Sequence, residues 1–203
     1  MKFIEEIKTY YQNTIKIEQN RFLFRDVVLL FIATIVFHIL YWATNMGDWI
    51  FGPFTKEVYD FFTYLAYKGS EFLCKTFLTQ PFDSHDSSFF FYFLDNFNEK
   101  IYSSVLCIVP DCSGVKQLLQ WLLVMLLCRG KFYKRMLYWF CGSIIIICVN
   151  IIRIFVLAYI ITHNANLFDV VHDWVARPLI YIIIFVMWWA WLKLFLKRKN
   201  IKQ

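Results

Sequence analysis

The chain has 203 residues, of which 60% are hydrophobic, 21% aromatic and 18% charged. Its apolar residues come in long unbroken runs, which exclude a soluble globular domain and indicate an integral membrane protein. The formal net charge of +6 comes from basic residues beside those runs, where they orient a membrane protein and contact anionic lipid head groups. We therefore expect membrane lipid, and no nucleic acid, among the partners.

The first 25 residues mix acidic, basic and aromatic side chains and lack a small-residue cleavage site, unlike a removable signal peptide. We expect these residues, 1–25, to form a cytoplasmic N-terminal segment. The next stretch, 26–47, is predicted to be a permanent anchor. Residues 27–47 contain no Asp, Glu, Lys or Arg, and a hydrocarbon core of about 30 Å needs about 20 such helical residues.

Residues 48–109 differ from the anchor and are assigned to the exported side. Polar residues recur here at the spacing of one face of an amphipathic helix. These polar positions are Glu57, Asp60, Tyr64, Lys68, Glu71 and Lys75. The opposite side is predicted to carry Val58, Phe61, Phe62, Leu65, Phe72 and Leu73. Such a helix suits the membrane surface better than a crossing. No element is assigned to the aromatic, turn-rich stretch that follows it.

Three further spans are predicted in the second half of the chain. They are residues 115–127, 136–161 and 178–196, within a catalytic core of residues 110–196 that a basic cytoplasmic tail, 197–203, follows. No internal repeat or low-complexity linker divides the chain, so one domain, 1–203, is expected. The predicted fold class is an all-α polytopic membrane protein with about four transmembrane helices and an exported-side amphipathic helix.

Basic residues flank the predicted spans in three groups. They are Arg21 with Arg25, the bases within 129–135, and those at 197–199. With four spans, all three groups fall on one side of the membrane, which the positive-inside rule identifies as the cytoplasm. We expect a multi-pass protein of the cytoplasmic (inner) membrane whose active site faces the exported or periplasmic side.

Three chemically notable residues reach one depth under this topology. Cys112 and the loop 163–173, which contains His172, face the exported side. Arg153 is the only charged residue of its span and follows Arg135 by about 27 Å of helix, at about 1.5 Å per residue. Arg153 therefore lies close to the same exported face.

Cys112 follows a proline that interrupts any earlier helix, and Ser113-Gly114 begins the next one. This position predicts a cysteine at a helix N-terminus, where the helix dipole favours the thiolate form. A thiolate is the nucleophile of cysteine acyl-transfer chemistry. The structural alternative is a disulfide with Cys107, because both residues face an oxidising compartment.

Arg153 is the strongest functional signal that the residues carry by themselves. An arginine inside a bilayer helix is costly and is tolerated where it faces a polar cavity or a partner. The partner could instead be an anionic lipid head group or a glutamate of the amphipathic helix. His172 would act as general base toward the thiol and then as acid toward the leaving amine. Asp169 or Asp173 could orient its ring, and the sequence leaves both open.

These residues stand in patterns that resemble the core of the exosortase/archaeosortase family of membrane transpeptidases. That core has a Cys in a C-[ST]-G setting, an Arg in an N-x-x-R-[IV] setting on the next helix and a His at the head of the one after. The matching residues are Cys112-Ser113-Gly114, Asn150-Ile-Ile-Arg153-Ile154 and His172. The resemblance runs from about Pro110 to the end of the last span, and this chain has fewer spans before the Cys than many family members.

The resemblance implies a membrane cysteine transpeptidase or protease with Cys112, Arg153 and His172 as catalytic residues. Ser113, Asn150, Asp169 and Asp173 are candidate supporting residues. The implied substrates are exported proteins with a C-terminal signal of short motif, hydrophobic span and basic tail, which are transferred to water or to a glycan or lipid acceptor. No cofactor is expected, and no His/Cys spacing predicts a metal site. The rival hypothesis is a non-catalytic membrane subunit with a Cys107–Cys112 disulfide and a lipid-binding Arg153.

Overall fold

The computed structural model describes residues 24–25, 27–41, 43–44 and 46–200. The chain divides into two compact units, Met1–Met46 and Gly47–Gln203. The first unit contributes one apolar helix, Val27–Tyr41, within the predicted anchor. Apart from Phe24 and Arg25, the predicted cytoplasmic segment 1–25 lies outside the described residues.

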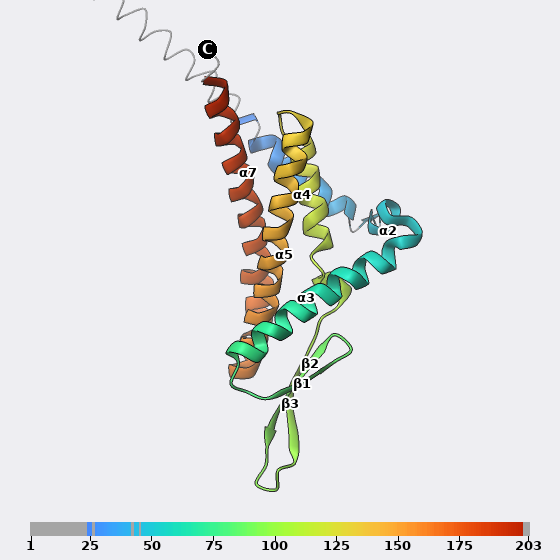
Figure 1. Ribbon diagram of the computed structural model, residues 1–203, viewed down its shortest axis with the longest axis vertical. Coiled ribbons are helices and arrows are strands. Elements are labelled where there is room, and N and C mark those ends of the chain that lie inside the picture. Colours follow the sequence, from blue (N-terminus) through green and yellow to red (C-terminus); the bar gives the residue numbers. More distant parts are fainter. Residues whose placement is uncertain (1–23, 26, 42, 45, 201–203) are drawn as a thin grey trace, which may run out of the picture. The chain divides into compact units, whose positions relative to one another are not determined.

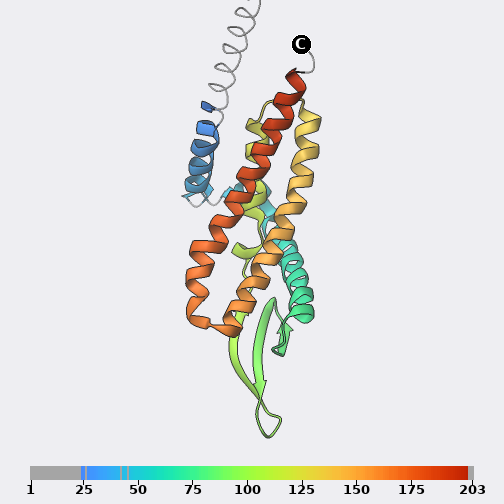
Figure 2. The same cartoon turned by 90° about the vertical axis from the view of Figure 1, so that its left-hand side faces the viewer.

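Three apolar helices pack side by side in the second unit (Figures 1 and 2). They are α4 (Val115–Leu127), α5 (Phe132–His163) and α7 (Arg177–Asn200). Both views place the α4–α5 turn at one end of this bundle and the connection from α5 to α7 at the other. The side chains of the predicted basic tail are not among those that the structure describes.

Close approach of α4 to α5 depends on a glycine. Trp121 of α4 is fully buried, and a Cβ atom on Gly142 would come within 2.4 Å of its indole Nε1. Only glycine leaves room for the ring here, and the indole N–H then donates to the Trp139 carbonyl at 3.1 Å. Tyr138 of α5, whose ring lies 5.9 Å from that of Trp121, donates its hydroxyl to the Met187 carbonyl of α7 at 2.9 Å. The three helices are thus joined by partly buried polar contacts as well as apolar packing.

The prediction of four transmembrane helices is not supported. Among the described residues, two helical runs are long and apolar enough to cross a membrane, Phe132–His163 and Ala165–Leu194. The other two predicted spans are shorter helices, Val27–Tyr41 and Val115–Leu127. The second of these has 13 residues, which at about 1.5 Å per residue reach only about 20 Å of a core of about 30 Å.

A long helix precedes the bundle in the chain. A short helix, α2 (Met46–Phe51), and a single 3-10 turn, Gly52–Phe54, lead into α3 (Thr55–Phe77). α3 contacts α5 and runs obliquely beside the half of α5 that lies nearer the strands (Figures 1 and 2), and β3 contacts α5 as well. The amphipathic helix expected from the sequence is therefore present.

The faces of α3 differ from those predicted. One polar and one apolar face were expected, but part of the polar set is buried and part of the apolar set is exposed. Glu71, placed on the solvent face by the sequence, is only 7% exposed, whereas Phe61 and Phe72 are 62% and 68% exposed. The buried face carries Thr63, Ala66, Tyr67, Ser70, Glu71 and Cys74. This face is buried because it packs against α5 and the sheet. The two phenylalanines are exposed on the surface of the helix, where they can contact an apolar environment such as lipid.

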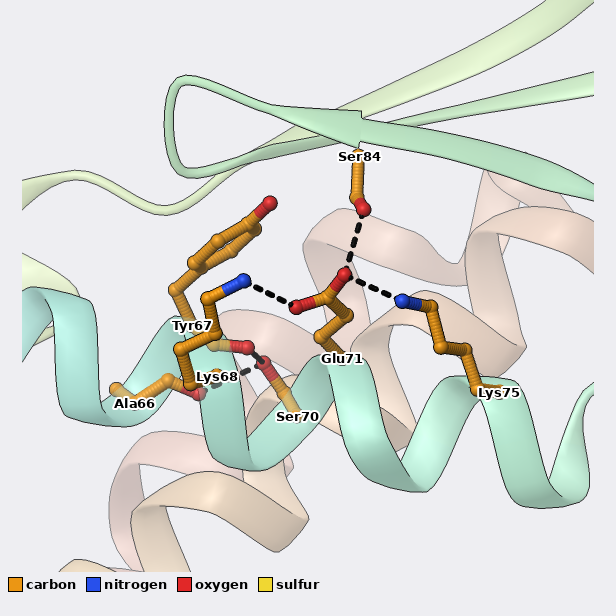
Figure 3. Close-up of polar contacts among 7 residues, drawn as sticks. All are labelled: Ala66, Tyr67, Lys68, Ser70, Glu71, Lys75 and Ser84. Carbon is orange, nitrogen blue, oxygen red and sulfur yellow. Dashed lines mark hydrogen bonds and ion pairs between the residues drawn. The ribbon is translucent and has the colours of Figure 1, made fainter.

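Glu71 connects α3 to the first strand (Figure 3). Its carboxylate accepts hydrogen bonds from Lys68 at 2.8 Å, from Lys75 at 2.7 Å and from the Ser84 hydroxyl at 2.7 Å. These three donors lower the pKa of Glu71 from its ordinary 4.5 to about 2. The charge is stabilised by donors from two elements, so Glu71 holds the helix against the strand.

The prediction of an all-α fold is wrong for residues 82–107, which form a three-stranded antiparallel sheet. The strands are β1 (Phe82–His85), β2 (Ser88–Leu94) and β3 (Lys100–Cys107), in the order β1-β2-β3. Asp86 and Ser87 join the first two strands with φ of 51° and 55°, as a two-residue type I′ hairpin requires. The aromatic run of β2 has high strand propensity.

One face of this sheet forms the hydrophobic core with α3 and α5. Phe89 and Phe91 are fully buried, and Tyr67 of α3 stacks on Phe89 with ring centroids 5.4 Å apart. Burial of a phenylalanine contributes about 1.5–3 kcal/mol, so this core is a main source of stability for the end of the bundle. Cys112 packs against the same cluster. The core therefore positions the chain that carries the candidate nucleophile.

Candidate active site

Cys112 ends a 3-10 turn, η2 (Pro110–Cys112), that follows β3 and contacts α3. Its backbone N–H donates to the Val109 carbonyl at 2.8 Å. Gly114, with φ of +84°, then turns the chain into α4. Cys112 therefore lies three residues before the start of α4 at Val115. The sequence had predicted a cysteine at the helix N-terminus itself. The dipole of α4 acts mainly within its first turn, so another group must stabilise a thiolate here.

Asn150 of α5 holds the backbone of this turn. Its side-chain N–H₂ donates to the Cys112 carbonyl at 2.7 Å, and the residue is 2% exposed. A Cβ atom on Gly114 would lie 3.3 Å from that nitrogen. Glycine is favoured here by its positive φ, and a side chain would also press on the Asn150 amide. Ser113 is buried, and its hydroxyl accepts the Val115 N–H at 3.3 Å, a local turn contact.

Arg153, one helical turn after Asn150, contacts the predicted histidine. Its Nη2 atom lies 3.1 Å from Nε2 of His172. A guanidinium has only donors, so we assign Nε2 as the acceptor and place the imidazole proton on Nδ1. That proton is donated to the Asp173 carboxylate, whose Oδ1 is 2.9 Å away. Asp173 thereby orients the ring and selects its tautomer.

Of the two candidate aspartates, the structure joins only Asp173 to the histidine. Asp169 is exposed and has no described contact with His172. Arg177 contacts the same oxygen of Asp173, with Nη1 at 3.1 Å from Oδ1. Phe168 stacks on the imidazole, with ring centroids 5.8 Å apart and planes 6° from parallel. One face of the His172 ring and both of its nitrogens are therefore in contact with neighbours.

His172 lies in a π-helical turn, Val171–Ala176, and not in the loop that the sequence predicts. A 3-10 turn, Ala165–Leu167, and one turn of α6, Phe168–Val170, precede it. Pro178 has no N–H and cannot bond to the carbonyl four residues back. The Arg177 N–H instead bonds to the His172 carbonyl, five residues back. Single π turns of this kind occur often at functional sites.

Arg153 also lies near the cysteine. The residue is 8% exposed, and Asn150, one helical turn before it, binds the Cys112 carbonyl. No hydrogen bond between Cys112 and His172 is among the contacts of the described residues. The predicted alternative partner, a glutamate of α3, does not apply to Glu71, which binds Lys68 and Lys75. α5 thus brings Arg153 into contact with His172 and holds Cys112 one helical turn away, through Asn150.

The other cysteines differ from Cys112 in their surroundings. Cys107 is a free thiol, exposed on β3. Cys74 is fully buried, and burial raises the pKa of its thiol to about 12, which makes it a poor nucleophile. Half-buried Cys112 is the cysteine that the structure places beside a buried cation.

Two residues of the site were not singled out from the sequence, Arg177 and Phe168. The signal for Arg177 was present, since an aspartate and an arginine four residues apart on a helix form an ion pair. Phe168 gave no comparable signal among so many aromatic residues. Within the described residues, no group of three His, Cys, Asp or Glu side chains could hold a metal ion.

Comparison of the chain with protein-family models, with curated proteins and with solved structures finds no match. The resemblance to the exosortase/archaeosortase core rests on the patterns around Cys112, Arg153 and His172. What the site can do is therefore argued from its own chemistry. It combines a half-buried thiol, a buried guanidinium and an imidazole oriented by a carboxylate.

Proposed function

We propose that this chain is a membrane-embedded cysteine transpeptidase or protease of the kind that the exosortase/archaeosortase resemblance implies. One observation carries the proposal: Arg153, buried in the apolar helix α5, binds His172 Nε2, while Asn150, one helical turn earlier, holds the Cys112 carbonyl. An arginine within a membrane helix costs about 2.5–3.5 kcal/mol on insertion scales. Its presence beside a thiol and an imidazole favours a catalytic role over a structural one.

In the first step Cys112 attacks the carbonyl carbon of the scissile peptide. The thiol proton passes to Nε2 of His172 while the sulfur–carbon bond forms, and the carbonyl oxygen becomes an oxyanion. The Arg153 guanidinium donates hydrogen bonds to that oxyanion, which is the largest source of rate enhancement in comparable sites. Asp173 stabilises the imidazolium that forms, through Nδ1.

The Arg153–His172 contact implies that substrate binds before the thiol loses its proton. In the structure the single lone pair of Nε2 accepts a hydrogen bond from Arg153, so it cannot accept the thiol proton at the same time. We assign Arg153 two successive partners, His172 before the substrate binds and the substrate oxygen afterwards. The change of partner frees His172 as a base when a carbonyl is in place.

In the second step the oxyanion collapses, and the peptide carbon–nitrogen bond breaks. His172 gives its proton to the leaving amine, and a thioester with Cys112 remains. Water, or an amine or hydroxyl of a surface glycan or lipid, then attacks the thioester and loses its proton to His172. The sulfur–carbon bond breaks, and the thiol recovers the proton from His172.

We place this chemistry at the exported face of the cytoplasmic (inner) membrane. α5 and the run Ala165–Leu194 cross the bilayer. α4 and the helix Val27–Tyr41 complete the four spans with their flanking residues, where the bilayer thins locally. The site then lies about 27 Å from Arg135, counted at about 1.5 Å per residue of α5 to Arg153. Arg135 itself donates to the Leu126 and Cys128 carbonyls at the opposite end of α4.

Exported proteins with a C-terminal motif, hydrophobic span and basic tail are the proposed substrates, and they provide the test. In cells carrying the parent chain, mass spectrometry of exported proteins should find these tails removed. Cys112→Ala should leave the tails in place, and Cys112→Ser should do so as well, because a hydroxyl is far less acidic than a thiol. Cys107→Ala is the matched control and should process normally. Tail removal by the Cys112→Ala variant would refute the proposal.

The rival function, a non-catalytic membrane subunit, requires a Cys107–Cys112 disulfide. A membrane-impermeant maleimide distinguishes the two without any substrate. If the thiols are free, exposed Cys107 should react before any reductant is added. If the residues are bridged, neither should react until the protein is reduced, and the catalytic proposal would fail.

A further inference from the structure

Two polar atoms at the candidate site are buried and have no hydrogen-bond partner among the described residues. They are Nε of Arg153, a donor, and Oδ1 of Asn150, an acceptor. Both residues are more than nine-tenths buried, at 8% and 2% exposure. An unpaired buried polar group costs folding free energy, so two of them together beside a candidate nucleophile need an explanation.

The position of the Asn150 amide follows from its other contact. Its nitrogen donates to the carbonyl of Cys112 at 2.7 Å, so the nitrogen and oxygen cannot be exchanged without losing that bond. The oxygen belongs to the same small amide group and is therefore held close to Cys112. Arg153 lies three residues later on the same face of α5, where Cβ atoms are about 5–6 Å apart.

An acceptor and a donor at this separation complement one residue of an extended peptide. In an extended chain the N–H and C=O of a residue point to the same side. The N–H can then meet the Asn150 oxygen while the C=O meets the Arg153 guanidinium. The carbonyl carbon between them is the atom that Cys112 attacks in the proposed function.

We propose that Asn150 is a substrate-binding residue whose side-chain oxygen accepts the N–H of the residue that Cys112 acylates. This inference rests on the proposed function and extends it to backbone recognition. Asn150 has two roles, holding the Cys112 carbonyl with its nitrogen and the substrate N–H with its oxygen. The site thereby selects extended peptide substrates with a free N–H at that position.

A pair of small thiol-directed probes tests this contact without a known substrate. N-acetylalanine chloromethyl ketone has a single N–H, next to the carbonyl that would occupy the site. Its ester counterpart replaces that N–H by oxygen. Both alkylate a thiolate with formation of a carbon–sulfur bond and loss of chloride. Mass spectrometry of the purified full-length protein gives the alkylation rate of each cysteine separately.

At Cys112 of the parent chain, the amide probe should react roughly tenfold faster than the ester, the effect of one hydrogen bond to a buried acceptor. At Cys107, which is exposed, the two rates should be equal. Asn150→Ala should remove the preference at Cys112. This variant also loses the hydrogen bond from Asn150 to the Cys112 carbonyl. That loss affects both probes equally, so it cancels in the ratio of their rates. Ser143→Ala, a buried polar change elsewhere on α5, should keep the preference.

The outcomes separate this inference from the proposed function. If Cys112 reacts with neither probe faster than a simple exposed thiol such as Cys107, the proposed nucleophile fails. If Cys112 is reactive but shows no amide preference, or keeps it in Asn150→Ala, the role of Asn150 fails. Should Asn150→Ala not accumulate, Asn150→Leu of similar volume replaces it, and the comparison in the parent chain alone can still overturn the inference.

Discussion

Arg153 Nη2 lies 3.1 Å from Nε2 of His172, and this contact joins two residues that come from α5 and from the π-helical turn before α7. It makes the arginine a partner of His172, whereas Glu71 of α3 pairs with Lys68 and Lys75. The contact also defines the tautomer of His172, because a guanidinium can only donate. Variants of Arg153 and Asp173 test this contact, and the membrane placement and Glu71 are tested separately.

Arg153→Lys should remain stable but lose most activity. A guanidinium presents a planar fork of donors that can serve His172 and an oxyanion, whereas lysine is a point charge on a flexible stem. Loss of one oxyanion donor typically lowers the rate by about 100- to 1000-fold. Measurement of tail removal together with protein level decides between a catalytic and a charge-only role. A fully active lysine variant would remove Arg153 from the catalytic residues.

Asp173→Asn should lower the rate of tail removal by about 10- to 100-fold, because the ring of His172 loses its orienting carboxylate. The effect should be smaller than for a fully buried aspartate, since the Asp173 side chain is 50% exposed. The change should appear in kcat and leave KM nearly unchanged. Asp169→Asn is the matched control and should behave like the parent, and equal losses in the two variants would contradict the assignment.

Reporter fusions test the membrane placement. A fusion at Lys131, in the α4–α5 turn, and one at Lys199 should both report the cytoplasm, as the flanking bases require. A fusion at Asn164, just after α5, should report the exported side. If Lys131 reads as exported, Cys112 and Arg153 could not act at the proposed face.

Glu71 should make the stability of the α3–sheet contact depend on pH in the acid range. Its folded pKa of about 2 is below the ordinary 4.5, so its contribution is full above pH 4.5 and is lost as pH falls toward 2. The two lysine partners are 48% and 63% exposed, and water screening limits the contribution to about 1 kcal/mol.

Denaturant unfolding in detergent of the parent and Glu71→Gln checks this. The parent should be more stable at pH 7, and the difference should shrink steadily below pH 4.5. Glu57→Gln, an exposed change on the same helix, should show no such trend. A difference that grows on acidification would have the wrong sign for a lowered pKa.

The sequence by itself determined the apolar character of the chain, the helices of its second half and the amphipathic helix before them. Those features depend on local composition and helical periodicity, which the residues carry without tertiary contacts. It also marked Cys112, Arg153 and His172, because polar residues stand out inside apolar runs. The sheet escaped prediction because the consecutive aromatics of β2 show no alternation, and its Asp86-Ser87 turn lacks the usual glycine.

Only the tertiary structure decided how the polar residues are paired. The sequence left Asp169 and Asp173 both open as partners of His172. In the structure His172 binds Asp173, its neighbour in the π-helical turn Val171–Ala176. Glu71 is buried because a strand supplies Ser84 opposite it. The Asn150–Cys112 and Arg153–His172 contacts join residues 38 and 19 positions apart, and these depend on packing that no local pattern contains.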